Sequence, residues 1–234
     1  MYSTKPNPLL TVVLLWASAA PLTARAVARR ELTAAIVTSA RRQLAEIGPA
    51  QLSVRAVARD LGMASSAVYR YFPSRDELLT ELLVVLYGEL ADRLEAADAG
   101  CERADLSGRW RTFGGTLRTW AMTAPHEYAF LYGSPVPGYA APATTIAPSA
   151  RVTGVLMGLA ADLDQVGPRT STFDDFRTLA GVDLSDEAIL STVTAWGGLL
   201  GAINLELFDH LHRAVTDYEA HFARVLERLD PARS

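Results

Sequence analysis

The sequence has a single cysteine, Cys101, among its 234 residues. One cysteine cannot form an intramolecular disulfide, and it also excludes a metal site built from several thiolates. Only four histidines are present, and the close pair, His210 and His212, is two residues apart. That spacing directs the two side chains to different sides of a helix. We therefore expect neither a disulfide framework nor a bound metal.

Motifs of common catalytic sites are also missing. The sequence contains no glycine-rich phosphate-binding loop, no HExxH pair of zinc ligands and no GxSxG nucleophile motif. The neighbouring acids Asp174 and Asp175 fall in a stretch that we interpret as a loop, where solvated carboxylates are the simpler explanation. We expect a protein that is not an enzyme and that needs no cofactor.

Lysine is nearly absent, because Lys5 is the only one, and positive charge comes from arginine. The net charge is −4, yet nine arginines stand against three acidic residues from Arg25 to Arg75, which gives +6 there and leaves −10 for the remainder. A basic segment is the electrostatic footprint of a phosphate-binding surface. A solvated helix face in an arginine-rich chain would look the same, so charge alone does not establish nucleic-acid binding.

The N-terminal segment is largely apolar from Leu9 to Ala20, and Pro21 follows. This run is too short to span a bilayer, which needs about 20 apolar residues. One lysine ahead of it makes a weak secretory signal. We expect residues 1–24 to form a poorly ordered extension. A short helix that lies on the protein or on a partner, and a true targeting segment, are the alternatives.

The most informative stretch runs from Ser53 to Leu78. Apolar residues recur there at the spacing of one helical face, Gly62 stands where a helix C-cap belongs, and a second apolar stripe begins with Val68 and Phe72. The second helix would direct small polar residues and an arginine outward. Two short helices joined through a glycine are typical of the helix-turn-helix, whose second helix enters the DNA major groove.

The order of residues in this stretch resembles the N-terminal DNA-binding domain of the TetR family of bacterial transcriptional regulators. The resemblance extends from about Arg29 to Leu86 and is carried by Ser53, Val57-Ala58, Leu61-Gly62-Met63, Ala67 to Phe72 and Ser74 to Leu78. It implies that phosphates are contacted by Ser53, Tyr69, Tyr71 and Arg75, that base edges are faced by Ser65, Ser66, Ala67 and Arg70, and that Arg29, Arg30 and Arg55 belong to the same DNA-binding surface.

Two positions depart from the pattern of the family. Ala64 stands where a serine or threonine usually caps the recognition helix, and Arg75 replaces the usual lysine. We expect the hydroxyl of Ser65 to take over the capping role, because it can accept an unpaired N–H of the first turn. An arginine at position 75 keeps the positive charge that attracts phosphate.

Hydrophobic periodicity predicts an all-α protein, with an N-terminal three-helix helix-turn-helix domain followed by a C-terminal bundle of about six helices. We assign residues 25–75 to the DNA-binding domain and residues 76–234 to a ligand-binding and dimerisation domain. The helix from Ser74 to about Ala96 is apolar on two sides, so it must pack against two partners. Further helices are predicted at 27–47, near 106–123, 126–132, 150–163, 186–212 and from 218 onward, with loops at 135–148 and 164–182.

Glycines interrupt the predicted helix 186–212 at 197, 198 and 201. Each one costs about 0.8–1 kcal/mol relative to alanine in a helix interior, so a packing reason is expected. Close approach of a second copy is one such reason, and it predicts a homodimer interface formed by Trp196, Gly197, Gly198, Gly201, Leu205, Phe208 and Phe222. The segment also resembles a TetR subgroup with a tryptophan, three residues and histidine-glycine, although Leu200 replaces the histidine here.

Aromatic residues concentrate on the two helices that precede the Pro/Gly-rich loop. Ligand pockets are mostly apolar with a few polar anchors, and the resemblance implies an effector site in the C-terminal domain. We expect an apolar or aromatic small-molecule effector to contact Trp110, Phe113, Trp120, His126, Tyr128, Tyr132 and Asn204. Each of these aromatic residues could equally belong to an ordinary core.

The sequence thus predicts a ligand-responsive transcriptional regulator that acts in the cytoplasm, most simply a repressor that binds a pseudo-palindromic operator in double-stranded DNA as a homodimer. No membrane partner is expected. The alternatives are a helical adaptor or structural protein that has lost operator binding, a small helical enzyme, and an exported helical binding protein that uses the apolar N-terminal run.

Overall fold

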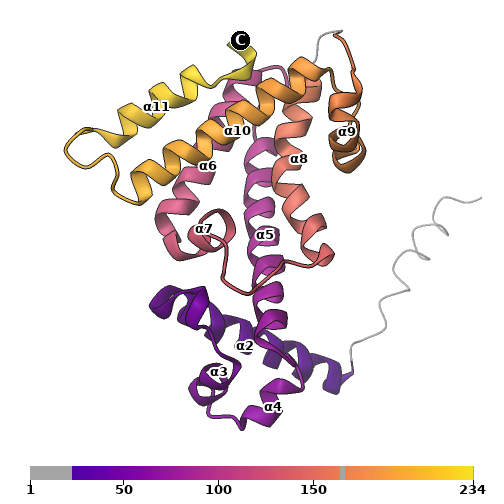
Figure 1. The fold of residues 1–234 in the computed structure, drawn as a ribbon, viewed down its shortest axis with the longest axis vertical. Coiled ribbons are helices and arrows are strands. Elements are labelled where there is room, and N and C mark those ends of the chain that lie inside the picture. The colour runs from indigo at the N-terminus through magenta and orange to yellow at the C-terminus, as the bar shows by residue number, and fades with distance from the viewer. Residues whose placement is uncertain (1–22, 164–166, 234) are drawn as a thin grey trace, which may run out of the picture.

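A computed structural model describes residues 23–163 and 167–233 (Figure 1). This part of the chain forms ten α-helices and no β-strand, which confirms the all-α prediction. The apolar run expected at the N-terminus lies outside the described residues. The helices are α2 (Ala24–Ile47), α3 (Val54–Asp60), α4 (Ser65–Tyr69), α5 (Arg75–Ala99), α6 (Leu106–Thr123), α7 (Pro125–Tyr132), α8 (Ile146–Leu163), α9 (Asp174–Ala180), α10 (Asp186–Leu207) and α11 (Tyr218–Arg228).

Buried apolar side chains form two clusters that share the long helix α5. This helix runs from the N-terminal helices α2 to α4 into the C-terminal helices (Figure 1). The N-terminal cluster joins α2, α3 and α4 to the first half of α5, where Leu78, Leu82 and Leu86 are buried. The C-terminal cluster joins α6, α8, α10 and α11 to the second half, which contributes Leu90 and Leu94. The prediction that this helix packs against two partners is confirmed. Because α5 belongs to both clusters, the two domains that we assigned to residues 25–75 and 76–234 share this helix.

The start of α5 follows local capping chemistry. Ser74 has an extended backbone, and its hydroxyl accepts the N–H of Glu77 at 3.1 Å. Asp76 and Glu77 occupy the first turn, where the helix dipole favours negative charge. The predicted N-cap is therefore confirmed, and it fixes the point at which the chain leaves the helix-turn-helix.

Three predicted boundaries were wrong. Helix α8 begins at Ile146 instead of 150. Pro148 falls in its first turn, where backbone N–H groups have no partner within the helix, so a proline is tolerated there. The segment 164–182 was predicted as a loop but contains α9, which ends at Gly181 in the left-handed conformation. Helix α10 stops at Leu207 instead of 212, because Asp209 and Arg213 both have positive φ.

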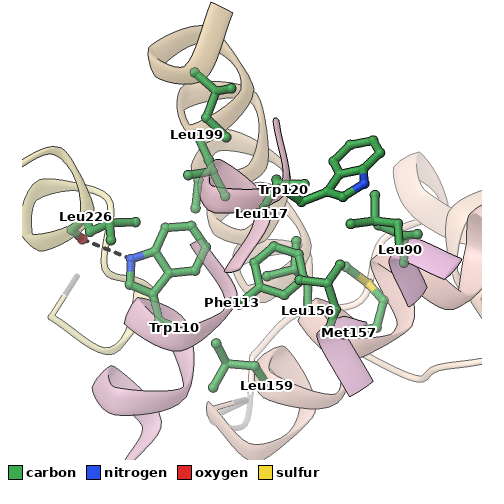
Figure 2. Close-up of a cluster of buried hydrophobic side chains, with 14 of the residues drawn as sticks. Leu90, Trp110, Phe113, Leu117, Trp120, Leu156, Met157, Leu159, Leu199 and Leu226 are labelled. Carbon is green, nitrogen blue, oxygen red and sulfur yellow. Dashed lines mark hydrogen bonds between the residues drawn. The ribbon is translucent and has the colours of Figure 1, made fainter. Parts of the chain in front are cut away.

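A buried arginine ties the C-terminal cluster together at one end. The Arg109 side chain on α6 is 1% exposed and donates to Asp98 at 2.7 Å and to Asp162 at 2.6 Å. Burial alone would lower the pKa of Arg109, but its hydrogen bonds to these carboxylates raise the pKa above its usual value, so the guanidinium stays charged. Next to it, the Trp110 indole N–H donates to the Leu226 carbonyl at 2.9 Å, which binds α6 to α11 (Figure 2).

We expect Gly114 and Gly115 to respond in opposite ways to the same substitution. A Cβ on Gly114 would lie 2.4 Å from a methyl of the buried Leu226, whereas a Cβ on Gly115 meets no atom within 4 Å. Gly114→Leu should lower the free energy of unfolding by about 1–3 kcal/mol through overpacking. Gly115→Leu, the matched control, should leave it unchanged or raise it by up to about 1 kcal/mol, because leucine is the better helix former. Urea titration followed by circular dichroism measures both, and equal stabilities would contradict the close α6–α11 packing.

Candidate DNA-binding surface and ligand cavity

The turn between α3 and α4 is built by the local sequence. Gly62 has φ +66°, a conformation that favours glycine, and the following N–H of Met63 bonds to the Ala58 carbonyl at 2.8 Å. Ala64 is the N-cap of α4, and no side chain caps this helix. The expectation that Ser65 caps the recognition helix is therefore wrong. Ser65 is the first residue of α4 itself, where its hydroxyl is not used as the cap.

The outward side of α4 carries most of the residues predicted to touch DNA. Ser66, Tyr69 and Arg70 are exposed, and Ser65 and Ala67 are half-buried. On the inward side, Val68 and Phe72 lie in the N-terminal cluster and hold the helix against α2 and α3. The exposed side therefore offers hydroxyls and one guanidinium to a partner, as a major-groove reader requires.

Arg29 and Arg30 of α2 and Arg55 of α3 are exposed. The Arg29 guanidinium lies over the Tyr71 ring, 5.3 Å from its centroid, so the structure brings α2 beside the end of α4. Arg30 lines a groove of about 730 Å³ between α2 and α5. On α3, Arg55 is exposed, and Ser53 is the N-cap without a side-chain capping bond. The roles of these residues on DNA stay predictions.

Arg75 has partners inside the protein that the sequence did not indicate. Its guanidinium donates to the carbonyls of Pro49 at 2.8 Å, Leu52 at 3.2 Å and Ala50 at 3.3 Å. These bonds tie the short 3₁₀ turn Pro49–Gln51 to the first turn of α5. Arg75 therefore positions the helix-turn-helix, and contact with a phosphate would be an additional role that stays a prediction.

Polar contacts fix α3 against α2. Asp60 accepts the hydroxyl of Ser39 and forms an ion pair with Arg42, both from α2. Ser39 is 3% exposed, so this contact lies mostly away from water. Charge-assisted bonds of this kind are stronger than neutral ones. The helix that precedes the recognition helix is thereby held at a defined angle.

A cavity of about 310 Å³ lies among α5, α7, α8, α9 and α10. Of the residues predicted to bind an effector, Tyr132 lines it, and Trp196 from the predicted dimer interface lines it as well. Trp110, Phe113 and Trp120 instead fill the C-terminal cluster, with 0%, 2% and 4% of their surface exposed (Figure 2). They pack with side chains of α8 and α10 in that cluster and do not line this cavity, so their contact with an effector stays a prediction.

The remaining predicted effector contacts also lie elsewhere. Tyr128 is fully buried, its hydroxyl donates to the Leu200 carbonyl at 3.3 Å, and burial raises the pKa of Tyr128 to about 12. His126 is exposed on α7, and Asn204 lies on α10 outside the cavity wall. None of the three lines this cavity, and their role in effector binding stays a prediction. Small residues on α8 at positions 149, 150, 153 and 154, spaced three and four apart, were the sequence signal for the true wall.

One side of α10 exposes apolar residues and glycines to solvent. Leu190, Val193, Leu205 and Phe208 have 44–52% of their surface exposed. The true inward residues are Ile189, Thr192, Ala195, Leu199, Ala202 and Ile203. Among the described residues, α10 is the single helix long and apolar enough to cross a membrane by length and composition. Its exposed apolar side accounts for that property.

The predicted dimer residues divide between this exposed side and the interior. Leu205 and Phe208 are exposed, and a Cβ added at Gly197 or Gly201 would meet no atom within 4 Å. A Cβ at Gly198 would lie 2.8 Å from Leu229 of the same chain, which explains this glycine without a partner. Phe222 and Trp196 do not lie on this exposed side, and their place in an interface stays a prediction. Phe222 is 3% exposed beneath the Arg118 guanidinium, and Trp196 belongs to the cavity wall.

Helix α7 connects the cavity to the helix-turn-helix. Its Tyr132 lines the cavity, while Phe130, two residues earlier, is buried in the N-terminal cluster. Arg41 of α2 donates to Glu127 of α7 at 2.8 Å and to Glu89 of α5 at 2.8 Å. A change in the position of α7 would therefore act on α2, the first described helix of the DNA-binding domain.

Within the described ranges, no group of three or more histidine, cysteine or acidic side chains could hold a metal ion. The arrangement offers a basic helix-turn-helix, an apolar cavity and an exposed apolar helix side. These features suit binding of a nucleic acid, a small molecule and another protein surface.

Comparison with known families identifies both parts of the chain. Residues 36–82 match the bacterial regulatory proteins of the tetR family, and residues 110–229 match a tetracyclin repressor-like C-terminal domain. The chain is 42% identical over 193 residues to the HTH-type transcriptional regulators Mb1846 of Mycobacterium bovis and Rv1816 of Mycobacterium tuberculosis. That alignment covers 77% of this chain and 82% of each relative.

Solved structures show the same fold. The crystal structure of SCO4313, described as a regulatory protein, shares 34% identity and a TM-score of 0.74 over 86% of this chain and 96% of its own. FadR of Bacillus subtilis, solved in complex with stearoyl-CoA, has 15% identity and a TM-score of 0.56 over 86% of this chain and 98% of its own, a likeness in fold alone. From the helix-turn-helix at one end to the matching helices at the other, the chain belongs to the TetR family of DNA-binding transcriptional regulators, which are not enzymes.

Proposed function

We propose that this regulator works in the cytoplasm as a homodimer that grips a pseudo-palindromic operator with two copies of α4 and releases it when a small molecule enters the cavity beside Tyr132. The proposal rests on the outward side of α4, where Ser66, Tyr69 and Arg70 are exposed. On the opposite side, Val68 packs the helix into the N-terminal cluster. Repression is the simplest outcome of such binding, since a protein on an operator obstructs transcription.

A dimer is needed because α4 has only five residues, Ser65–Tyr69, and reads few base pairs. Two copies related by a two-fold axis would read half-sites about one helical turn apart, roughly 34–36 Å, or a multiple of it. The exposed side of α10 supports this assembly. Leu190, Val193, Leu205 and Phe208 leave an apolar surface that soluble monomers usually avoid, and Gly197 and Gly201 would let a second helix approach closely.

Control by a ligand is supported by the two helices that the cavity shares with the DNA-binding part. Tyr87 of α5 and Tyr132 of α7 line the cavity. The same two helices contribute Leu86 and Phe130 to the N-terminal cluster. A ligand that binds one position of these helices more tightly shifts the dimer toward that position and so changes the separation of the recognition helices.

We expect Arg70→Ala to lower operator affinity by about 1–3 kcal/mol if its guanidinium grips a guanine edge bidentately. Affinity for random DNA should fall much less. Tyr69→Phe, which removes one hydroxyl from the same exposed side, should weaken both DNAs alike if it contacts phosphate. Fluorescence anisotropy with the DNA upstream of the gene for this protein and with a shuffled duplex measures both. Equal losses on the two DNAs for Arg70→Ala would refute base reading, and no operator binding by the parent would refute the regulator.

We expect Leu205→Glu to shift the dimer toward monomer, because a charge on the apolar side of α10 would be buried without a partner. Gly201→Leu should act in the same direction, since the added side chain fills space left for a second helix. Ala223→Glu is the matched control, because it adds the same charge to an exposed position of α11. Sedimentation velocity measures the three variants. A dimer that survives both α10 substitutions would place the interface elsewhere.

A further inference from the structure

The cavity among α5, α7, α8, α9 and α10 has a wall without charge. Among the described residues, its lining consists of four aromatic side chains, three small hydroxyl residues, and aliphatic or glycine positions. The aromatic residues are Tyr87, Tyr132, Phe176 and Trp196. Burial raises the pKa of Tyr87 and Tyr132 above its usual value, so both phenols stay neutral. A charged group inside this wall would lose its hydration and find no opposite charge.

The two arginines that follow wall residues in the sequence form ion pairs outside the cavity. Arg151 follows Ala150 on α8, but its guanidinium forms ion pairs with Asp92 and Glu95, each at 2.6 Å. Arg177 follows Phe176 on α9, where it forms an ion pair with Asp186 and donates to the Leu184 carbonyl at 2.8 Å. Neither guanidinium lines the cavity. An anionic ligand would therefore have to break existing ion pairs to obtain a partner.

Among the described residues of the wall, four of the five hydroxyl groups have already used their protons, and the fifth belongs to Tyr132. Ser149 donates to the Ile146 carbonyl at 2.9 Å, Thr153 to Ala150 at 3.2 Å and Thr192 to Ala188 at 2.7 Å. The Tyr87 hydroxyl donates to the Leu131 carbonyl at 3.3 Å. A hydroxyl has one proton and two lone pairs, so each of these groups faces a ligand as an acceptor. Four acceptors against one free hydroxyl proton, that of Tyr132, favour a ligand that supplies N–H or O–H donors.

We infer that the cavity binds an uncharged, ring-containing molecule that donates hydrogen bonds, such as an aromatic amide or phenol. The aromatic side chains provide ring faces and edges, which stack favourably on aromatic ligands. The volume of about 310 Å³ lies at the lower end of the range for small-molecule sites, roughly 300–1,000 Å³. An acyl-CoA, whose phosphates carry several negative charges, does not match this wall.

The experiment compares three probes of nearly the same shape by calorimetry on the full-length protein. The probes are 4-phenylbenzamide, which is neutral and donates, methyl 4-phenylbenzoate, which is neutral without a donor, and 4-phenylbenzoate, which is charged and only accepts. The amide should bind at least about tenfold more tightly than the carboxylate, a difference of about 1.4 kcal/mol. The ester should lie between them. No binding of the amide, equal binding of amide and carboxylate, or displacement of the amide by stearoyl-CoA would overturn the inference.

Two glycines of α8 show whether the amide binds in this cavity. Gly154 lines the cavity and Gly158 does not, and a Cβ on either would meet no atom within 4 Å. Gly154→Leu should therefore fill the cavity and reduce amide affinity by at least about tenfold, while Gly158→Leu, one turn later, should retain it. Unfolding curves check that both variants fold. Unchanged amide binding by Gly154→Leu would place the ligand elsewhere and overturn the assignment.

This inference rests on the proposed function only for its regulatory meaning, and operator binding measured on the same samples separates the two. If the amide binds as described but does not change operator affinity, the ligand class stands and control through this cavity fails. If the carboxylate binds more tightly than the amide while operator binding is intact, the ligand class fails and the regulator stands.

Discussion

The burial of α5 on two sides is the constraint on which the rest of the structure depends. Its first half is covered by the helix-turn-helix and its second half by the C-terminal helices, and Leu78, Leu82, Leu90 and Leu94 have no exposed surface. Each buried leucine contributes about 1.5–3 kcal/mol relative to an exposed one. Two cores that share one rigid helix cannot shift independently. Displacement of α5 in one core must be absorbed in the other, and this is the physical basis for coupling a cavity to a DNA-binding surface.

Helix α7 adds a second connection of a different kind. Phe130 and Val136 extend the N-terminal cluster, and Arg41 joins α2 to α5 and α7 through Glu89 and Glu127. These ion pairs are partly exposed, so each contributes modestly. Their value lies in geometry, because one guanidinium holds three helices at a fixed separation. The apolar contacts supply most of the stability, and the ion pairs fix the position of the two parts of the molecule relative to each other.

The interior of the C-terminal part separates ordinary core from the space available to a ligand. Trp110 and Phe113 are stacked, with 6.5 Å between their ring centroids, and the Trp110 indole bonds to the Leu226 carbonyl of α11. On the other side, Tyr132 and Trp196 meet edge to face at 5.7 Å and border the cavity. Both pairs are aromatic, and their difference is only which helices lie opposite them. Small residues of α8 leave space at the second pair, whereas larger side chains fill it at the first.

The sequence by itself determined the helix-turn-helix, because its signals are local. A glycine with positive φ at position 62, the hydroxyl cap at Ser74 and apolar spacing within one or two turns are decided by neighbouring residues. Helix α10 is apolar on nearly all sides, so periodicity could not tell which side is buried in the chain. The cavity, the interior partners of Arg75 and the burial of Phe222 all depend on contacts between residues far apart in the chain. Only the tertiary structure decided these features, because burial and partnership arise from packing and are not encoded in any local pattern.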